Sequence, residues 1–202
     1  KMQKLMGLMK NIADMPAGEV KLNNSMLNTR FKRMQQRAAT QHTTSRETIY
    51  LVRIIISNLN ATLTHGIPVR GIIQLGQYLR SRREQIDANE ATQWLRRLHI
   101  SRMAQLQGSV LIKFFGFKAE EIPFVKQVEP AAESLILRSI NRMELATQAW
   151  HFKQGKSVFV HNNQKALRRN LSHCMRYFPY APIETTSSFF VNFSKGLAEI
   201  EE

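Results

Sequence analysis

Apolar side chains recur at spacings of three and four along most of the chain, which is the pattern of helices with one buried face. One such stripe predicts a helix over residues 2–13, and another predicts a helix over residues 26–40. Asn24 or Ser25 can cap the second helix. Its apolar stripe consists of Leu27, Phe31, Met34 and Ala38.

A different pattern lies between these two helices, where apolar and polar residues alternate. Over residues 19–23, Val20 and Leu22 fall on one side, and Lys21 and Asn23 fall on the other. Alternation with a period of two predicts a short, half-buried strand.

A third helix is predicted to begin at Thr44-Ser45-Arg46-Glu47, where Thr44 and Glu47 have the spacing of a reciprocal capping box. Up to Leu59 this helix is apolar on almost every side, so it must be covered on almost every side. One strand and one helix offer too little surface, and we expect a second chain to supply the rest. The expected dimer core consists of Val20, Leu22, Phe31, Ile49, Val52, Ile56 and Leu59.

The turn residues His65 to Pro68 divide the chain. We expect a helix within residues 1–17, a strand-helix-helix unit over residues 18–64 and a mostly helical domain over residues 65–202. In this last part the pattern predicts a helix around residues 72–79, a helix capped by Asn89 that carries Trp94 to Met103, and helices over residues 131–152 and 163–177. A β-prone run over residues 109–117 predicts one or two strands.

The charge adds a class of partner to this helical outline. The 202 residues hold 29 Lys plus Arg and 15 Asp plus Glu, which gives a net charge of +14. Residues 1–60 carry +7, residues 61–110 carry +4 and residues 111–202 carry +3. Such a balance favours polyanions as partners, and it places the binding face in the N-terminal part.

The sequence offers little support for other classes of protein. The single cysteine, Cys174, cannot form an internal disulfide, which favours a reducing cytoplasm. No apolar run is long enough to cross a membrane, and the first residues lack the pattern of a secretory signal, so we expect no membrane partner.

Catalytic and metal-binding patterns are also missing. The six histidines lack the close spacing of metal ligands, and Gly66, Gly71 and Gly76 lack the Lys-Ser/Thr of a phosphate loop and are interpreted as helix-packing positions. His173 and Cys174 are neighbours on a predicted helix, where their side chains diverge by about 100°. We therefore expect no metal, no cofactor and no enzyme activity. Phe114, Phe115 and Phe117 could stack on bases in a strand, but core packing is the favoured interpretation.

A short strand with Lys and Asn on its polar side, a basic helix, a turn and a capped apolar helix together resemble the ribbon-helix-helix DNA-binding family. The resemblance covers about 40 of the 202 residues, including the run Thr44-Ser45-Arg46-Glu47-Thr48-Ile49. It implies a mainly α fold in which two chains pair their strands into a ribbon that enters the major groove, while their second helices intertwine. The remaining residues would form a larger, mostly helical C-terminal extension.

This resemblance implies a set of DNA contacts. Lys21 suits the acceptors of guanine and Asn23 suits adenine, with Ser25 as a third base contact or only a cap. Contacts to phosphates are expected from two groups, since the start of the third helix can present its backbone amides to an anion. They are Arg30, Lys32, Arg33 and Arg37 on the basic helix, and Thr44, Ser45 and Arg46 at the start of the next helix.

Three further segments resemble the extended domain of the AcaB-type transcriptional regulators of conjugative plasmids and integrative conjugative elements. They are Ile72 to Leu79, Ala91 to Leu95, and Asn163 to Arg169. The resemblance implies a nucleoid-associated homodimer in the bacterial cytoplasm, able to assemble further on DNA, that activates conjugation genes. Two alternatives stay open: a relaxosome accessory protein at an origin of transfer, and a helical structural subunit that binds nucleic acid without sequence preference.

Overall fold

The structure is a computed structural model that describes residues 19–41, 45–140 and 171–198. Its named helices are α2 (Ser25–Gln41), α3 (Arg46–His65), α4 (Val69–Ser81), α5 (Ala88–Arg97), α6 (Ser101–Phe115) and α9 (Pro182–Ala198), with short 3₁₀ turns at Arg83–Gln85 and Ala119–Glu121. Residues 132–140 and 171–177 are also helical. These described ranges contain no strand, and the prediction of a mainly α fold is confirmed for them.

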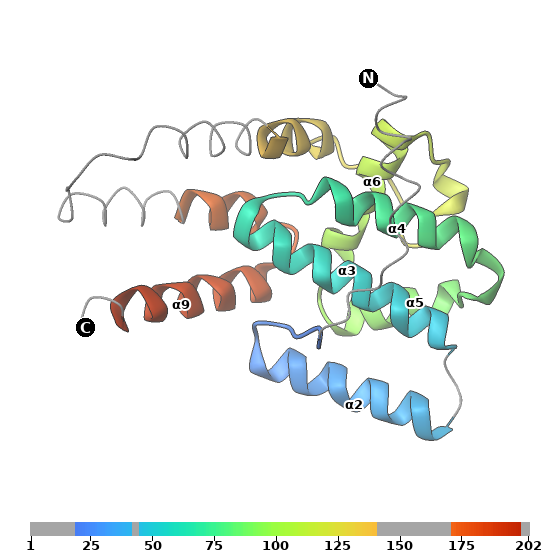
Figure 1. Cartoon of the computed structure of the whole chain (residues 1–202), viewed down its shortest axis with the longest axis horizontal. Coiled ribbons are helices and arrows are strands. Elements are labelled where there is room, and N and C mark those ends of the chain that lie inside the picture. Colours follow the sequence, from blue (N-terminus) through green and yellow to red (C-terminus); the bar gives the residue numbers. More distant parts are fainter. Residues whose placement is uncertain (1–18, 42–44, 141–170, 199–202) are drawn as a thin grey trace, which may run out of the picture.

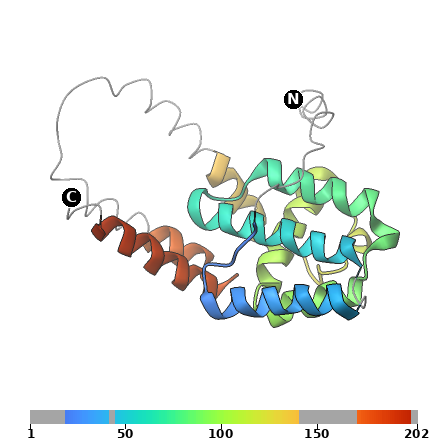
Figure 2. The same ribbon diagram turned by 60° about the horizontal axis from the view of Figure 1, so that its bottom comes forward.

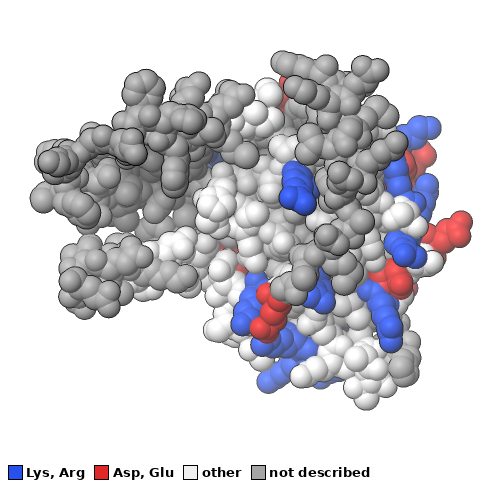
Figure 3. Space-filling model, viewed as in Figure 1, with Lys and Arg blue, Asp and Glu red and all other residues white. Residues whose placement is uncertain are grey.

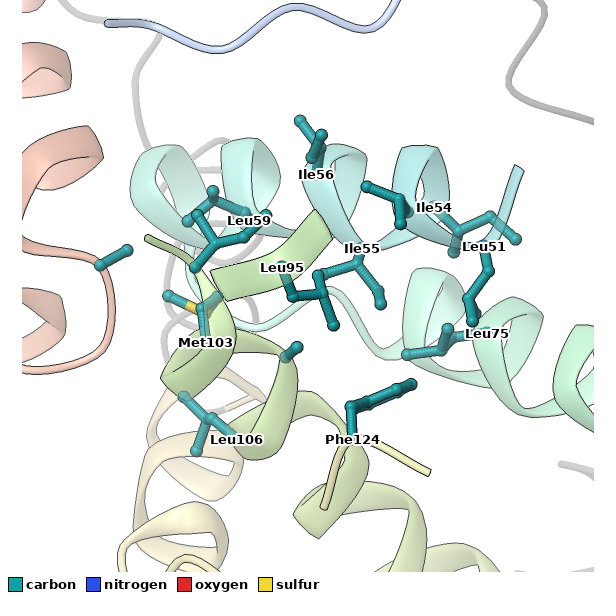
Figure 4. Close-up of a cluster of buried hydrophobic side chains, with 14 of the residues drawn as sticks. Leu51, Ile54, Ile55, Ile56, Leu59, Leu75, Leu95, Met103, Leu106 and Phe124 are labelled. Atoms are coloured by element: carbon teal, nitrogen blue, oxygen red, sulfur yellow. The ribbon is translucent and has the colours of Figure 1, made fainter. Parts of the chain in front are cut away.

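The apolar helix α3 is the centre of the fold. It packs against α4, α5 and α6, with α2 along one edge of the molecule (Figures 1 and 2). Leu51, Ile55 and Leu59 on α3 are fully buried and meet side chains from α4, α5 and α6 (Figure 4). The buried side chains form one cluster that runs from Leu22 to Ala181.

This cluster corrects the expectation that a second chain must cover α3. Within a single chain, the expected dimer-core residues Leu22, Phe31, Val52, Ile56 and Leu59 are at most 4% exposed. The other two, Val20 and Ile49, are half-buried against the same cluster. Helices that follow position 65 supply the cover, so the burial of α3 does not require an intertwined dimer.

The strand expected over residues 19–23 is also wrong, since these residues form an irregular segment ahead of α2. Side chains of the same chain bind the backbone groups that a ribbon would need. The Leu22 amide donates to Asn28 Oδ1 at 3.1 Å, and the Asn60 side chain donates to the Lys21 carbonyl at 2.7 Å. The amide of Asn23 donates to Glu184 Oε2 at 2.7 Å.

Helices α2 and α3 lie where the patterns predicted them, and their caps differ in detail. Asn24 caps α2 through a bond from the Leu27 amide, as one of the two expected choices. The side chain of Ser45 accepts from the Thr48 amide at the start of α3, and the expected cap residue Thr44 lies outside the described residues.

The segment from Asn89 to Met103 forms two helices where one was predicted. Asp87 caps α5 in place of Asn89, accepting from the Glu90 amide at 2.9 Å. The break between α5 and α6 occurs at His99, whose φ of 56° lies in the left-handed region.

The strand predicted over residues 109–117 is wrong as well, because α6 continues to Phe115 and ends at Gly116 in the left-handed conformation. A short apolar run cannot distinguish a buried helix from a buried strand. The alternative in which Phe114, Phe115 and Phe117 stack on bases required a strand, and these residues form none. Phe117 is buried in the core, as the favoured interpretation predicted, while Phe114 is exposed.

The break at residues 65–68 is confirmed as the end of α3, where Gly66 has a φ of 105°. The other two spaced glycines lie on α4 and allow close helix packing: a Cβ on Gly71 would overlap the Asn58 side chain, and one on Gly76 would lie 2.8 Å from Leu111. The helix expected over residues 2–13 lies outside the described residues, as do most of those expected over 131–152 and 163–177. Of the helices that the structure describes, none has the length and apolar character needed to cross a membrane.

Candidate nucleic-acid interface

The basic face of α2 is the most strongly charged feature that the sequence singled out. The apolar stripe Leu27, Phe31, Met34 and Ala38 is buried, so the opposite face of the helix points to solvent. Because residues three and four apart share a helix face, Arg30, Arg33 and Arg37 line up on the exposed side. Figure 3 shows Lys and Arg side chains gathered on the surface around α2.

Two contacts fix α2 against α5. The rings of Phe31 and Trp94 meet edge to face with 6.3 Å between their centroids. Arg30 Nη1 donates a hydrogen bond of 2.7 Å to the carbonyl of Arg97 in the last turn of α5. This bond supplies a cation to a helix end that has unsatisfied carbonyl groups, which is a favourable electrostatic arrangement.

An open hollow with a volume of about 680 Å³ lies between α2 and the end of α5, and we call it the α2 hollow. Its lining residues are Ser25, Met26, Thr29, Arg30, Arg33, Met34, Arg37 and Arg97. Four of these eight residues are arginines and none is acidic. Arg33 and Arg37 make no ion pair with any residue in the described ranges. The α2 hollow is therefore a concentrated positive surface that an anion can reach.

The expected phosphate contacts divide into two groups. Arg30, Arg33 and Arg37 line the α2 hollow, whereas Lys32 forms an ion pair of 3.0 Å with Glu19. Lys21 lies 2.9 Å from the same carboxylate. Together the two lysines lower the pKa of Glu19 below its ordinary value, through hydrogen bonds to the exposed carboxylate. This cluster before α2 is thus partly neutralised.

The expected base contacts no longer share a projecting strand. Lys21 and Asn23 are exposed, and the Asn23 side chain donates to Asn60 Oδ1 at 3.4 Å. Ser25 is exposed in the first turn of α2 and lines the α2 hollow. Of the three residues, only Ser25 lies beside the arginines.

The phosphate site expected at the start of α3 stays a prediction, and one of its hydroxyl groups already has partners within the chain. Ser45 Oγ accepts from the Thr48 amide at 3.1 Å and donates to the Gln85 carbonyl at 2.7 Å. Its hydroxyl is occupied by its own chain. Arg46 is exposed beside it, and Thr44 lies outside the described residues.

The residue that sequence reasoning missed is Arg97. The only signal for it was the basic pair Arg96-Arg97 at the end of the helix that carries Trp94. Arg97 is 67 residues from Arg30 in the sequence, and nothing in the pattern placed the two side by side.

Other chemistry has little support. The His173 ring donates to the Thr62 carbonyl at 2.9 Å in a buried position, and burial raises the pKa of the neighbouring Cys174 thiol. Among the residues with described positions, no group of three His, Cys, Asp or Glu side chains could hold a metal ion.

Comparisons of this chain with protein-family models, with curated proteins and with solved structures gave no match. The interpretation of the site therefore rests on its own geometry and charge.

Proposed function

We propose that this chain is a sequence-specific regulator that binds duplex DNA through α2 and the α2 hollow. One observation carries the proposal: Arg30, Arg33, Arg37 and Arg97 line one open hollow that has no carboxylate in its lining. Arginine forks match the geometry of phosphate oxygens and of the guanine edge, and a nucleic acid presents both along its length.

The shape of α2 supports DNA as the polyanion. Its 17 residues span about 25 Å at a rise of about 1.5 Å per residue, and the helix lies along an edge of the molecule (Figures 1 and 2). The major groove of B-DNA is about 12 Å wide and admits one α-helix. An edge helix can enter this groove without moving the core.

The exposed face of α2 also carries groups that can distinguish bases. Ser25 offers a hydroxyl group, and Met26 offers an apolar contact for the thymine methyl group. The Thr29 hydroxyl donates to the Ser25 carbonyl at 2.9 Å and can still accept a hydrogen bond from a base. We assign base contacts to this face instead of to Lys21 and Asn23, because the ribbon that would have carried those two residues is missing. Arg33 and Arg37 then neutralise phosphates, while Arg30 is held against the end of α5.

A role in conjugative transfer comes only from the resemblance to the AcaB-type regulators, and the DNA-binding step of the proposal does not depend on it. The proposal also does not require a second chain, because α2 of one chain carries the base contacts.

The test is equilibrium binding of the full chain to labelled duplex DNA, single-stranded DNA and RNA at several salt concentrations. In duplex DNA each phosphate contact contributes about 0.9 to the slope of log K against log salt. Arg33→Gln and Arg37→Gln should therefore each lower the slope by about one. Each should also weaken binding by about tenfold, or about 1.4 kcal/mol. Arg70→Gln is the matched control, because Arg70 is an exposed arginine on α4 outside the α2 hollow.

Selection from random genomic fragments tests the sequence preference. We expect one recovered motif, with a loss of about 1 to 3 kcal/mol per wrong base pair. Equal affinity for all duplexes, or stronger binding to RNA or single strands, would contradict the regulator and favour the non-specific structural subunit.

A further inference from the structure

A second hollow, smaller and more enclosed than the first, lies beside the end of α5. It has a volume of about 210 Å³ and is lined by the last turn of α5, the first turn of α6 and the segment after α6. We call it the α5–α6 hollow. Its polar lining includes Arg96, Arg102, Lys126 and Ser101, and its apolar lining includes Leu95 and Phe124.

The charges around the α5–α6 hollow do not balance. Among the carboxylates of the described residues, only Glu129 contacts its cations, with 3.7 Å between Glu129 Oε1 and Arg102 Nη2. Glu129 is buried outside the lining and accepts a 2.8 Å hydrogen bond from Gln105. Arg96 and Lys126 have no ion pair with the residues in the described ranges. Of the three cations that line the hollow, only Arg102 thus has a carboxylate partner within the described ranges.

The position of Arg102 is fixed by more than this contact. Its guanidinium group also lies 5.4 Å from the centre of the Tyr180 ring. A guanidinium held on one side by a carboxylate and a ring keeps further N–H donors available, since the group has five. The Arg102 side chain is 59% exposed, so these donors are open to an anion.

The start of α6 adds to the positive potential. Ile100 is the cap residue of α6 and gives no side-chain hydrogen bond to the first turn. The backbone amides of that turn lie at the positive end of the helix dipole, which favours an anion next to Ser101.

We propose that the α5–α6 hollow binds one phosphate group. Its volume lies below the range of roughly 300 to 1,000 Å³ that is usual for larger ligands, so a compact anion fits better than an extended one. Arginine and lysine together are the side chains that proteins use to hold phosphate. The phosphate can come from a nucleic-acid backbone or from free phosphate.

The backbone source rests on the proposed function. Arg96 lines the α5–α6 hollow and its neighbour Arg97 lines the α2 hollow, so both hollows adjoin the last turn of α5. The backbone source requires that a DNA strand in the α2 hollow continues past this turn toward Arg96 and Lys126. The free-phosphate source does not depend on DNA binding.

The first arm of the test uses inorganic phosphate and the full chain. Thermal unfolding is followed while phosphate replaces chloride at constant ionic strength, since a ligand that binds only the folded state raises the melting temperature. We expect the melting temperature to rise in the unmodified chain. The apparent affinity should fall at least about tenfold in Arg96→Gln and Lys126→Gln, the loss expected for one charge-assisted contact. Both residues are exposed, so these variants should fold, and Arg70→Gln again controls for the loss of one charge.

The second arm repeats the duplex-binding salt series with the same variants. If the bound phosphate belongs to the DNA backbone, Lys126→Gln should lower the slope of log K against log salt by about one. If the site binds free phosphate, this slope should stay unchanged while the phosphate-dependent rise in melting temperature is lost. Either result supports the α5–α6 hollow as a phosphate site.

The two proposals fail in different ways. If the chain does not bind duplex DNA but its phosphate response requires Lys126, the regulator fails and the phosphate site stands. If duplex binding requires Arg33 and Arg37, but neither the phosphate response nor the slope depends on Arg96 and Lys126, the phosphate site is overturned and the regulator stands.

Discussion

Single polar residues inside the core decide how tightly the helices approach. The Asn58 amide on α3 donates to the Gly71 carbonyl at 3.0 Å and to Gln107 Oε1 at 3.2 Å. Gln107 in turn donates to the Ile55 carbonyl at 3.1 Å. This satisfied network links α3, α4 and α6, and such networks are costly to disturb because each buried polar group needs its partner.

Replacing Gly71 with Ala should destabilise the protein through this network. The new Cβ would overlap Asn58 Oδ1, so the amide must move and its hydrogen bonds must weaken. Overpacking of this kind typically costs about 1 to 3 kcal/mol, which urea unfolding would measure. Arg70→Ala, at the exposed neighbouring position, should stay within about 0.5 kcal/mol of the unmodified chain. Equal stability of Gly71→Ala and Arg70→Ala would contradict the close approach.

At the scale of elements, α9 holds the start of α2 across 160 residues of sequence. Glu184 accepts from the amides of Asn23 and Asn24, and the Asn24 side chain donates to Ser187 Oγ at 3.0 Å. Glu184 is 1% exposed, and no ion pair in the described part of the chain includes it. Burial raises its pKa above the ordinary value of 4.5, although the two amide bonds oppose the shift.

This buried carboxylate should make stability depend on pH. Because its pKa is raised in the folded state, the folded chain holds the proton to higher pH than the unfolded chain. The contribution of Glu184 to stability is therefore largest below about pH 4.5 and decreases as the pH rises through the raised pKa. The free energy of unfolding of the unmodified chain, minus that of Glu184→Gln, should fall over this interval.

Urea unfolding of both proteins from about pH 4 to about pH 8 would measure this difference. Groups outside this contact, such as Glu19 and Glu121, titrate in both proteins and cancel in the subtraction. A difference that stays constant with pH would show that Glu184 keeps an ordinary pKa in the folded chain.

At the scale of the whole molecule, α3 depends on helices that follow it in the sequence. Leu51, Ile55 and Leu59 are buried by side chains from α4, α5 and α6 (Figure 4). Each buried aliphatic side chain contributes about 1.5 to 3 kcal/mol, so α3 would lose most of its stabilisation without them.

A fragment that ends after residue 64 should therefore fail to fold. We expect low helical content by circular dichroism and no cooperative thermal transition, while the full chain should show both. A cooperatively folded dimer of this fragment, seen by light scattering, would contradict the structure and restore the intertwined dimer that the sequence predicted.

Local patterns determined much of this protein without the structure. The stripe from Leu27 to Ala38 was enough to define α2, its buried face and its arginine face, because residues three and four apart on a helix share a side. The excess of Lys and Arg likewise favours a polyanionic partner from composition alone, and this partner stays a prediction. The local pattern does not show which residues of the chain pack against each helix face.

The tertiary structure decides the remaining features, because each depends on contacts between residues that are far apart in the sequence. Glu184 and Asn60 bind the backbone of residues 21–24, which turns a strand-like alternation into an irregular segment. Helices of the same chain cover α3, where its composition alone suggested a second chain. Arg97 lies beside Arg30 only because Phe31 packs on Trp94, and so the hollow that carries the proposed function exists only in the folded chain.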